Sequence, residues 1–266
     1  MMQSFHGEAK QVNALVYWLD MAGVIVFALS GVVIACRTRM DPIGMLVLGA
    51  VTGIGGGTLR DLVLGVRPVF WVSDPAYLWV IIATVALSML GFHYIHRLSR
   101  VFLPVADAFG LALFTVIGAH KALMLDTSGV VAVLMGLMTG VAGGMVRDVL
   151  ARRVPMVLRE EIYATASIAG GICMVAGYKL GVPQIIAIGL GLAITLGLRL
   201  AAIHWRLALP TFAWVVIERP HLPAPPDQQG SAEVTPPKRR AKARVKLIPP
   251  ERRRRGRPSS SSKPPE

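Results

Sequence analysis

The sequence has few cysteines and few charges. Its two cysteines, Cys36 and Cys173, both lie in apolar runs, which excludes a disulfide framework and leaves no metal-ligand spacing. Only 16% of the residues are charged and 54% are hydrophobic, whereas about a quarter of the residues of a soluble domain are charged. The chain therefore has too little charge to coat a soluble fold of its size, and we expect it to lie in a membrane.

The charge that is present gathers at one end of the chain. Residues 219–266 contain nine Arg and four Lys against four acidic residues, a net charge of +9 within a formal total of +13. This segment is also rich in Pro and Ser, a composition typical of disorder. The high pI therefore belongs to a tail, and it does not indicate a nucleic-acid-binding fold. We expect the tail to contact anionic lipid, with nucleic acid an unlikely partner and a specific partner protein the alternative.

Seven segments are long and apolar enough to predict membrane-spanning helices, because a span needs about 20 residues. They cover residues 13–35, 42–64, 77–95, 103–125, 130–151, 162–180 and 184–203. None alternates like a barrel strand. The first run is too long for a signal-peptide core and ends in Arg37 rather than at a cleavage site. The fold class predicted is an all-α membrane protein with seven transmembrane helices.

The orientation follows from the Lys and Arg residues of the short loops. The more basic side carries Arg37, Arg39, Arg97, Arg100, Arg152, Arg153 and Arg159. The other side carries Lys10, Arg67, Lys121 and Lys179. We predict a multi-pass protein of the inner (plasma) membrane with its N-terminus outside and its C-terminus in the cytoplasm.

An internal repeat appears when the chain is aligned with itself at an offset of 87 residues. The matched positions include two Arg-Asp pairs, Arg60-Asp61 and Arg147-Asp148, and the isolated pair Asp20 and Asp107. Each copy holds three spans, an odd number, so the second copy enters the membrane from the opposite side. Such inverted repeats are typical of transport proteins with a site between the repeats.

This repeat sets the predicted organisation of the chain. The chain is predicted to divide into a periplasmic segment (1–12), a first repeat (13–98), an inverted second repeat (99–181), a seventh helix (182–206) and a basic, mostly disordered tail (207–266).

Glycines cluster in the second and fifth spans, in the motifs TGIGGGTLRD and TGVAGGMVRD. Because glycine lowers helix stability, the triplet Gly55–Gly57 and the equivalent pair Gly143–Gly144 favour a broken helix, with close packing of small residues as the alternative. A break would free backbone carbonyls, which can replace the hydration water of potassium. The predicted ion-pathway residues are Thr52, Gly53, Gly55, Gly56, Gly57, Thr139, Gly140, Gly143 and Gly144.

Charged residues inside spans are costly, so they normally pair or face water. Six are predicted to form two polar clusters, one toward each face of the membrane: Asp20, Arg60 and Asp61, and Asp107, Arg147 and Asp148. They would line a polar path, or only neutralise each other and lock the helices together. The histidines lie near span ends without a nucleophile motif, so we predict no enzyme activity, cofactor or metal.

On these motifs the chain resembles the prokaryotic branch of the trimeric intracellular cation (TRIC) channel family, whose domain has also been labelled a glycine transporter. The resemblance covers residues 13–203. It implies a homotrimer in which each protomer has a potassium-permeable pore, kinked at Gly55–Gly57 and Gly143–Gly144. The second copy has Ala142 where a full triplet would have glycine, so a milder kink is expected there.

Function is therefore predicted as a passive, potassium-permeable channel for monovalent cations. The alternative is a transporter of glycine or another small amino acid, which would use the same repeat around a midplane site. A membrane scaffold whose tail binds a partner is a third hypothesis.

Overall fold

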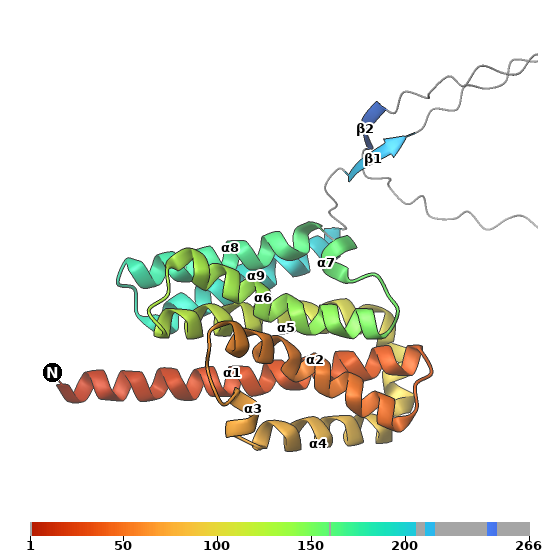
Figure 1. Cartoon of the computed structure of the whole chain (residues 1–266), viewed down its shortest axis with the longest axis horizontal. Coiled ribbons are helices and arrows are strands. Elements are labelled where there is room, and N and C mark those ends of the chain that lie inside the picture. The colour runs from red at the N-terminus through yellow and green to blue at the C-terminus, as the bar shows by residue number, and fades with distance from the viewer. Residues whose placement is uncertain (1, 160, 206–210, 216–243, 249–266) are drawn as a thin grey trace, which may run out of the picture. The chain divides into compact units, whose positions relative to one another are not determined.

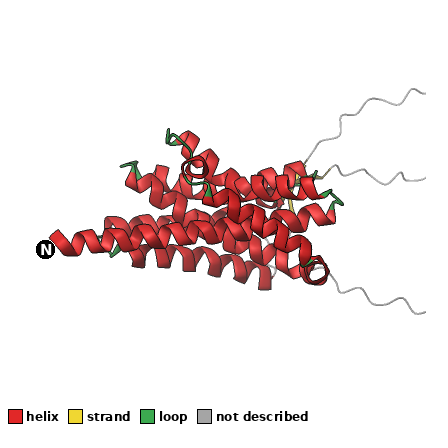
Figure 2. Cartoon of the chain, turned by 90° about the horizontal axis from the view of Figure 1, so that it is seen from below, coloured by secondary structure: helices red, strands yellow, loops and turns green. Residues whose placement is uncertain are grey.

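The computed structural model describes residues 2–159, 161–205, 211–215 and 244–248, with side chains described for residues 10–91, 102–159 and 162–205. Within these residues the membrane part is helical (Figures 1 and 2). Its helices are α1 (Met2–Arg37), α2 (Pro42–Val63), α3 (Phe70–Ser73), α4 (Ala76–Leu90), α5 (Phe92–Met124), α6 (Gly129–Leu150), α7 (Met156–Arg159), α8 (Glu161–Lys179) and α9 (Gln184–Trp205). The all-α membrane fold class is confirmed.

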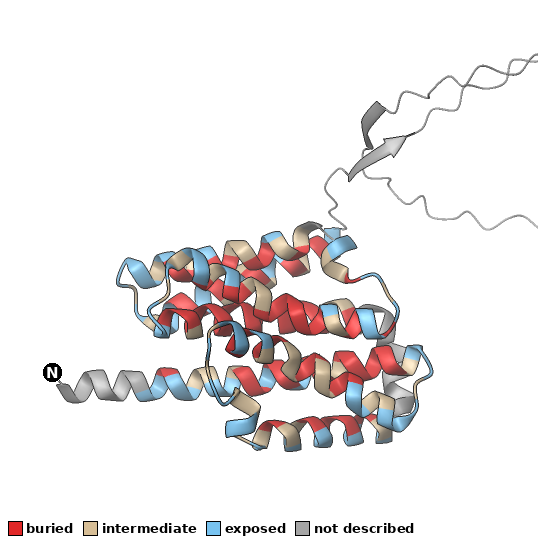
Figure 3. Ribbon diagram, in the orientation of Figure 1, coloured by how far each residue is buried: buried red, intermediate tan, exposed pale blue. Residues whose placement is uncertain are grey.

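The two copies of the repeat are α1, α2 and α4, and α5, α6 and α8, with α9 as the seventh long helix. The short helices α3 and α7 occupy equivalent positions before the third helix of each copy. α1 packs on α2 and α5 on α6, while α1–α5 and α2–α6 contacts join the copies. Buried residues gather along these central helices, and outward faces are exposed (Figure 3).

Five of the helices are long and apolar enough to cross a bilayer: α1 from Lys10, α2, α5 from Phe102, α6 and α9. α4 is a shorter apolar helix, and α8 has 19 residues. Large apolar side chains point outward, among them Trp79, which is 71% exposed, and Leu90, which is 85% exposed. An outer surface of this kind is stable against lipid and not against water.

The predicted boundaries need correction at two places. α1 begins at Met2, eleven residues before the predicted start of the first span. Gly91 alone separates α4 from α5, so the loop predicted over residues 96–102 is wrong and its backbone belongs to α5. The reason is local: Gly91 ends α4, and no other glycine interrupts the chain before Pro104, which the helix accommodates internally.

The C-terminal unit contains two short strands, β1 (Thr211–Val215) and β2 (Arg244–Ile248). They pair antiparallel, with Thr211 opposite Ile248. Neither strand was predicted. The rest of the predicted tail lies outside the described residues.

Both copies begin and end their second helix alike. The Asp41 carboxylate accepts from the Gly44 backbone N–H at the start of α2, and the Ser128 hydroxyl accepts from the Val131 N–H at the start of α6. Such N-caps satisfy backbone donors that a helix end leaves unpaired. After α2 the chain turns at Gly65 (φ +72°), and after α6 at its repeat equivalent, Arg152 (φ +53°). The caps thus set equal lengths for the two helices.

The first and second helices of each copy touch through glycine. A Cβ on Gly31 would lie 2.8 Å from the Leu48 carbonyl oxygen, and one on its equivalent Gly118 would lie 2.6 Å from the Met135 carbonyl oxygen. At the centre, the Phe27 and Phe114 rings pack with centroids 5.1 Å apart. These contacts leave no room for a side chain at either glycine.

We expect Gly31→Ala and Gly118→Ala each to lower the free energy of unfolding in detergent by about 1–3 kcal/mol, because the added methyl group must push two backbones apart. Gly197→Ala in α9 is the matched control, since nothing lies within 4 Å of its added Cβ. It should be neutral or stabilise by up to about 1 kcal/mol. Equal thermal melting curves for Gly31→Ala and Gly197→Ala would refute the close packing.

Candidate functional site

α2 and α6 cross where their glycine motifs lie. A Cβ built on Gly56 would collide with the Thr139 carbonyl oxygen, and one on Gly143 would lie 2.5 Å from the Thr52 carbonyl oxygen. The two contacts are equivalent under the repeat, and their order along the chain makes the crossing antiparallel. The backbones of the two repeats therefore touch directly, with no side chain between them.

No break interrupts either helix, whereas the kinks expected at Gly55–Gly57 and Gly143–Gly144 stay predictions. α2 is helical throughout Pro42–Val63, and α6 throughout Gly129–Leu150. The alternative, close packing of small residues, describes the motifs: Gly57 accommodates the Phe70 ring, and Gly53 and Gly140 lie near backbone carbonyls of α1 and α5. A continuous helix satisfies its own carbonyls, which in lipid is less costly than a break.

Two predicted pathway glycines, Gly55 and Gly144, make no tight backbone contact at the crossing. Gly55 has room, because its Cβ would lie 3.9 Å from the Gly143 Cα, and Gly144 faces the Asp107 carboxylate instead. Thr52 and Thr139 are fully buried, and their hydroxyls donate to the Leu48 and Met135 carbonyls of their own helices. Their backbone carbonyl oxygens, rather than their hydroxyls, face the opposite helix.

One group of charged and polar side chains surrounds Asp61, and we name Asp20, Arg60, Asp61, Tyr77 and Lys121 the Asp61 cluster. Asp61 Oδ1 accepts from Arg60 Nε at 2.8 Å and from Lys121 Nζ at 2.7 Å. Its Oδ2 accepts from the Phe70 backbone N–H. Asp20 Oδ2 accepts from the Tyr77 hydroxyl at 2.8 Å. Both carboxylates are thus buried, and Asp61 is held by helices of both repeats.

A second group surrounds Asp148, and we name Ser30, Asp107, Arg147, Asp148, Tyr163 and Arg199 the Asp148 cluster. Arg147 Nε donates to Asp148 Oδ1 at 3.0 Å. Its NH1 donates to Asp107 Oδ1 at 3.0 Å and to the Ser30 hydroxyl at 2.8 Å. The Arg147 side chain is 0% exposed, so its charge is neutralised entirely within the protein.

The two clusters lie at opposite ends of the crossing. Asp107 and Lys121 are 14 residues apart on α5, about 21 Å along the helix. The antiparallel crossing likewise sends Asp61 and Asp148 in opposite directions from the glycines. The structure therefore brings the six predicted charged residues into the two groups that the repeat implies, joined along α1, α2, α5 and α6.

Sequence reasoning missed five members of these clusters: Ser30, Tyr77, Lys121, Tyr163 and Arg199. The guanidinium of Arg199, which is 1% exposed, lies 4.6 Å from the centroid of the Tyr163 ring. A basic residue within the apolar span 184–203 was itself a signal of a buried partner. The tyrosines were missed because the repeat shifts by one residue after Pro155. Tyr77 and Tyr163 are therefore 86 residues apart rather than 87.

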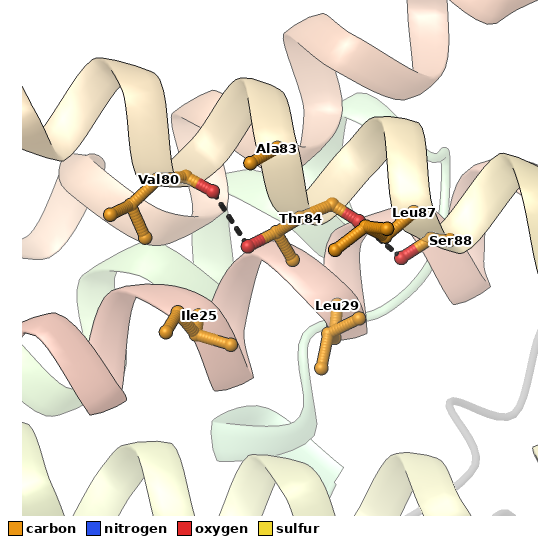
Figure 4. A pocket seen from close by; sticks show the side chains of 7 residues that line it. All are labelled: Ile25, Leu29, Val80, Ala83, Thr84, Leu87 and Ser88. Atoms are coloured by element: carbon orange, nitrogen blue, oxygen red, sulfur yellow. Dashed lines mark hydrogen bonds between the residues drawn. The ribbon is translucent and has the colours of Figure 1, made fainter.

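A groove of about 500 Å³ lies between α1 and α4, and no cluster residue is part of its lining (Figure 4). Its lining is Ile25, Leu29, Val80, Ala83, Thr84, Leu87 and Ser88. The hydroxyls of Thr84 and Ser88 donate to the carbonyls of Val80 and Thr84 in their own helix. The groove therefore offers little to a charged or zwitterionic ligand.

Fold and site together define an α-helical membrane protein built from an inverted repeat, with charged side chains buried inside its bundle. A family model described as "Glycine transporter" matches residues 17–93 and 104–179. Curated relatives include the UPF0126 inner membrane protein YadS of Escherichia coli K12, 54% identical over 75% of this chain and 97% of that protein. A UPF0126 membrane protein of Vibrio cholerae is 52% identical over 76% of this chain and 84% of that protein.

Solved structures with the same fold come from TRIC channels. The TRIC trimeric intracellular cation channel orthologue from Rhodobacter sphaeroides is 41% identical, with a TM-score of 0.70 over 73% of this chain and 99% of that chain. A second structure, of a TRIC cation channel, is 33% identical, with a TM-score of 0.67 over 73% and 95%. The chain belongs to the TRIC channel family, which also carries the UPF0126 and glycine-transporter names.

We expect Arg147→Met to lower the free energy of unfolding by about 3–5 kcal/mol, because it leaves two buried carboxylates against one cation. The double variant Arg147→Met/Asp107→Asn keeps the cluster neutral and should recover part of this loss. Exposed Arg159→Met is the matched control and should stay within about 0.5 kcal/mol of the parent. If the single and double variants melt at the same temperature, Arg147 and Asp107 are not coupled.

Proposed function

We propose that the protein is a potassium-permeable channel for monovalent cations, with a pathway between α2 and α6 in each protomer. The observation that carries this proposal is the antiparallel glycine crossing, which has a buried charge cluster at each end. Solved relatives with the same fold are TRIC cation channels. Because two backbones touch at the crossing, the conformation described here is closed.

Opening would require α2 and α6 to part at Gly56 and Gly143. Glycine contacts suit such a movement, because no interdigitated side chains must be withdrawn. Parting would turn the carbonyl oxygens of Thr52 and Thr139 toward the gap, and carbonyl oxygens bind potassium in place of its hydration water. The same oxygens would repel anions, so the pathway favours cations.

The assembly and orientation form part of the same proposal. Relatives described as trimeric support a homotrimer with one pathway in each protomer. The basic loops support an N-terminus outside and a cytoplasmic C-terminus, with the basic tail near anionic lipid of the inner leaflet. In this orientation the Asp61 cluster lies toward the outside and the Asp148 cluster toward the cytoplasm.

The proposal predicts a cation-selective current from the purified protein in planar bilayers. Under a tenfold KCl gradient the reversal potential should approach the potassium equilibrium potential, about 59 mV from zero. A reversal potential near zero or toward chloride would contradict cation selectivity. Uptake of labelled glycine into proteoliposomes in the absence of current would favour the transporter instead, and liposomes without protein are the control for both assays.

A further inference from the structure

Gly57 and Gly144 are equivalent positions of the repeat, each three residues before a buried arginine, yet their surroundings differ. A Cβ on Gly57 would lie 2.6 Å from a ring carbon of Phe70. The centroid of the same ring lies 5.5 Å from the guanidinium carbon of Arg60. In the first copy an aromatic ring therefore fills the space between the glycine and the arginine.

Polar atoms surround the equivalent point in the second copy. A Cβ on Gly144 would have three side-chain atoms nearest to it: Asp107 Oδ1 at 3.4 Å, Tyr163 Oη at 3.6 Å and Arg147 Nη2 at 3.7 Å. These are ordinary van der Waals distances, so this point has room for an added atom. The residues around it are buried, and the side chains of Arg147 and Asp107 are 0% exposed.

Two polar atoms of this group have no hydrogen-bond partner among the residues that the structure describes. Arg147 Nη2 is a donor without an acceptor, and Asp107 Oδ2 is an acceptor without a donor. Buried polar atoms are nearly always bonded to protein or to an ordered water, because a missing partner costs free energy. The Arg147 donor and the Asp107 carboxylate both border the space beside Gly144, so one small molecule placed there can bond to both.

The charges around this space determine which molecule fits it. The Asp148 cluster has two carboxylates, Asp107 and Asp148, and two guanidinium groups, Arg147 and Arg199, so it is already neutral. A cation in the space would face the Arg147 donor, and an anion would face the Asp107 carboxylate. Either ion would also leave a net charge in a site of low dielectric constant, which is costly. A water molecule can accept from the one group and donate to the other, as buried waters do.

We infer that a water molecule is bound beside Gly144, where it accepts from Arg147 Nη2, donates to the Asp107 carboxylate and contacts the Tyr163 hydroxyl. Glycine at this position leaves the space for it. In the first copy the Phe70 ring takes up the equivalent space. The same position of the repeat is therefore dry in the Asp61 cluster and hydrated in the Asp148 cluster.

The water also has a role in the pathway, and this role rests on the function proposed above. Gly144 directly follows Gly143, so the water lies beside the contact at which α2 and α6 would part. Its oxygen can turn toward a cation without the movement of a helix. It would add one oxygen ligand to the carbonyl oxygens of Thr52 and Thr139.

The first test compares the thermal unfolding of Gly144→Ala and Gly144→Ser in detergent. Alanine is more favourable than serine within a helix. Because an added methyl group has room, packing alone predicts that Gly144→Ala keeps the parent melting temperature and melts above Gly144→Ser. A methyl group that displaces a water leaves a buried donor and acceptor unpaired, and should lower the melting temperature by about 3–10 °C. A serine hydroxyl can replace the water, so Gly144→Ser should melt above Gly144→Ala.

Gly55 is the matched control position for this comparison. A Cβ there would have only the Gly143 Cα and a Val51 methyl carbon near it, both at 3.9 Å, and neither is polar. Gly55→Ala should therefore melt above Gly55→Ser. The same order at Gly144, whether or not both variants lose stability, would overturn the bound water.

A crystal structure of the parent protein gives the direct test. It should show density for a water within hydrogen-bonding distance of Arg147 Nη2 and the Asp107 carboxylate. Crystals soaked in thallium(I), an anomalously scattering substitute for potassium, separate a water from a cation. Absence of density beside Gly144, or an anomalous peak there, would overturn the water.

The unitary potassium current tests the role of the water in the pathway. Gly144→Ala should reduce this current severalfold, and Gly144→Ser should retain more of it. An unchanged current in Gly144→Ala would overturn the water as a ligand of the cation. If neither the parent nor any variant conducts, while Gly144→Ser melts above Gly144→Ala, the channel is refuted and the bound water is retained.

Discussion

Buried charge in a low-dielectric bundle is the constraint on which the rest of this structure depends. Four carboxylates, Asp20, Asp61, Asp107 and Asp148, are each at most 7% exposed. Removing one partner of a buried pair costs several kcal/mol, so each carboxylate fixes the positions of the helices that neutralise it. The Asp61 cluster holds α1, α2, α4 and α5 together, and the Asp148 cluster holds α1, α5, α6, α8 and α9.

Between the clusters α2 and α6 meet through glycine, at Gly56 and Gly143. Ion pairs tie both of these helices to α5 at opposite ends of the crossing, Lys121–Asp61 for α2 and Arg147–Asp107 for α6. The middle of the crossing is a contact between backbones, without interlocked side chains. Such an arrangement fixes the ends of the bundle. The centre is then the part that can separate with the least loss of packing.

Much of the fold could be predicted from the sequence, because its signals are local or periodic. Hydropathy predicted the seven long helices, and the 87-residue offset predicted the repeat and both Arg-Asp pairs. The broken helices were wrong because glycine both weakens a helix and permits another backbone to touch it. Sequence alone does not say which effect prevails, and the nearby carbonyls of Thr52 and Thr139 decide it here.

The rest of the site depends on how far side chains reach across helices. Lys121 counted as a loop charge for orientation, yet its long stem brings it to Asp61, 60 residues away in sequence. The tyrosines were hidden by a one-residue shift in the repeat, because an ungapped offset pairs Tyr77 with Ala164 rather than with Tyr163. Such contacts can be found only in the folded structure, because neither the periodicity nor the motifs of the sequence specify them.

The central claim is that cations pass between α2 and α6, and its most direct test is the accessibility of a cysteine at Gly55. This position has room for a side chain beside Gly143. In a protein with Cys36 and Cys173 replaced by serine, Gly55→Cys should react with a cationic thiol reagent from water, and the reaction should block the potassium current. Full modification with an unchanged current would place the pathway elsewhere and contradict the account.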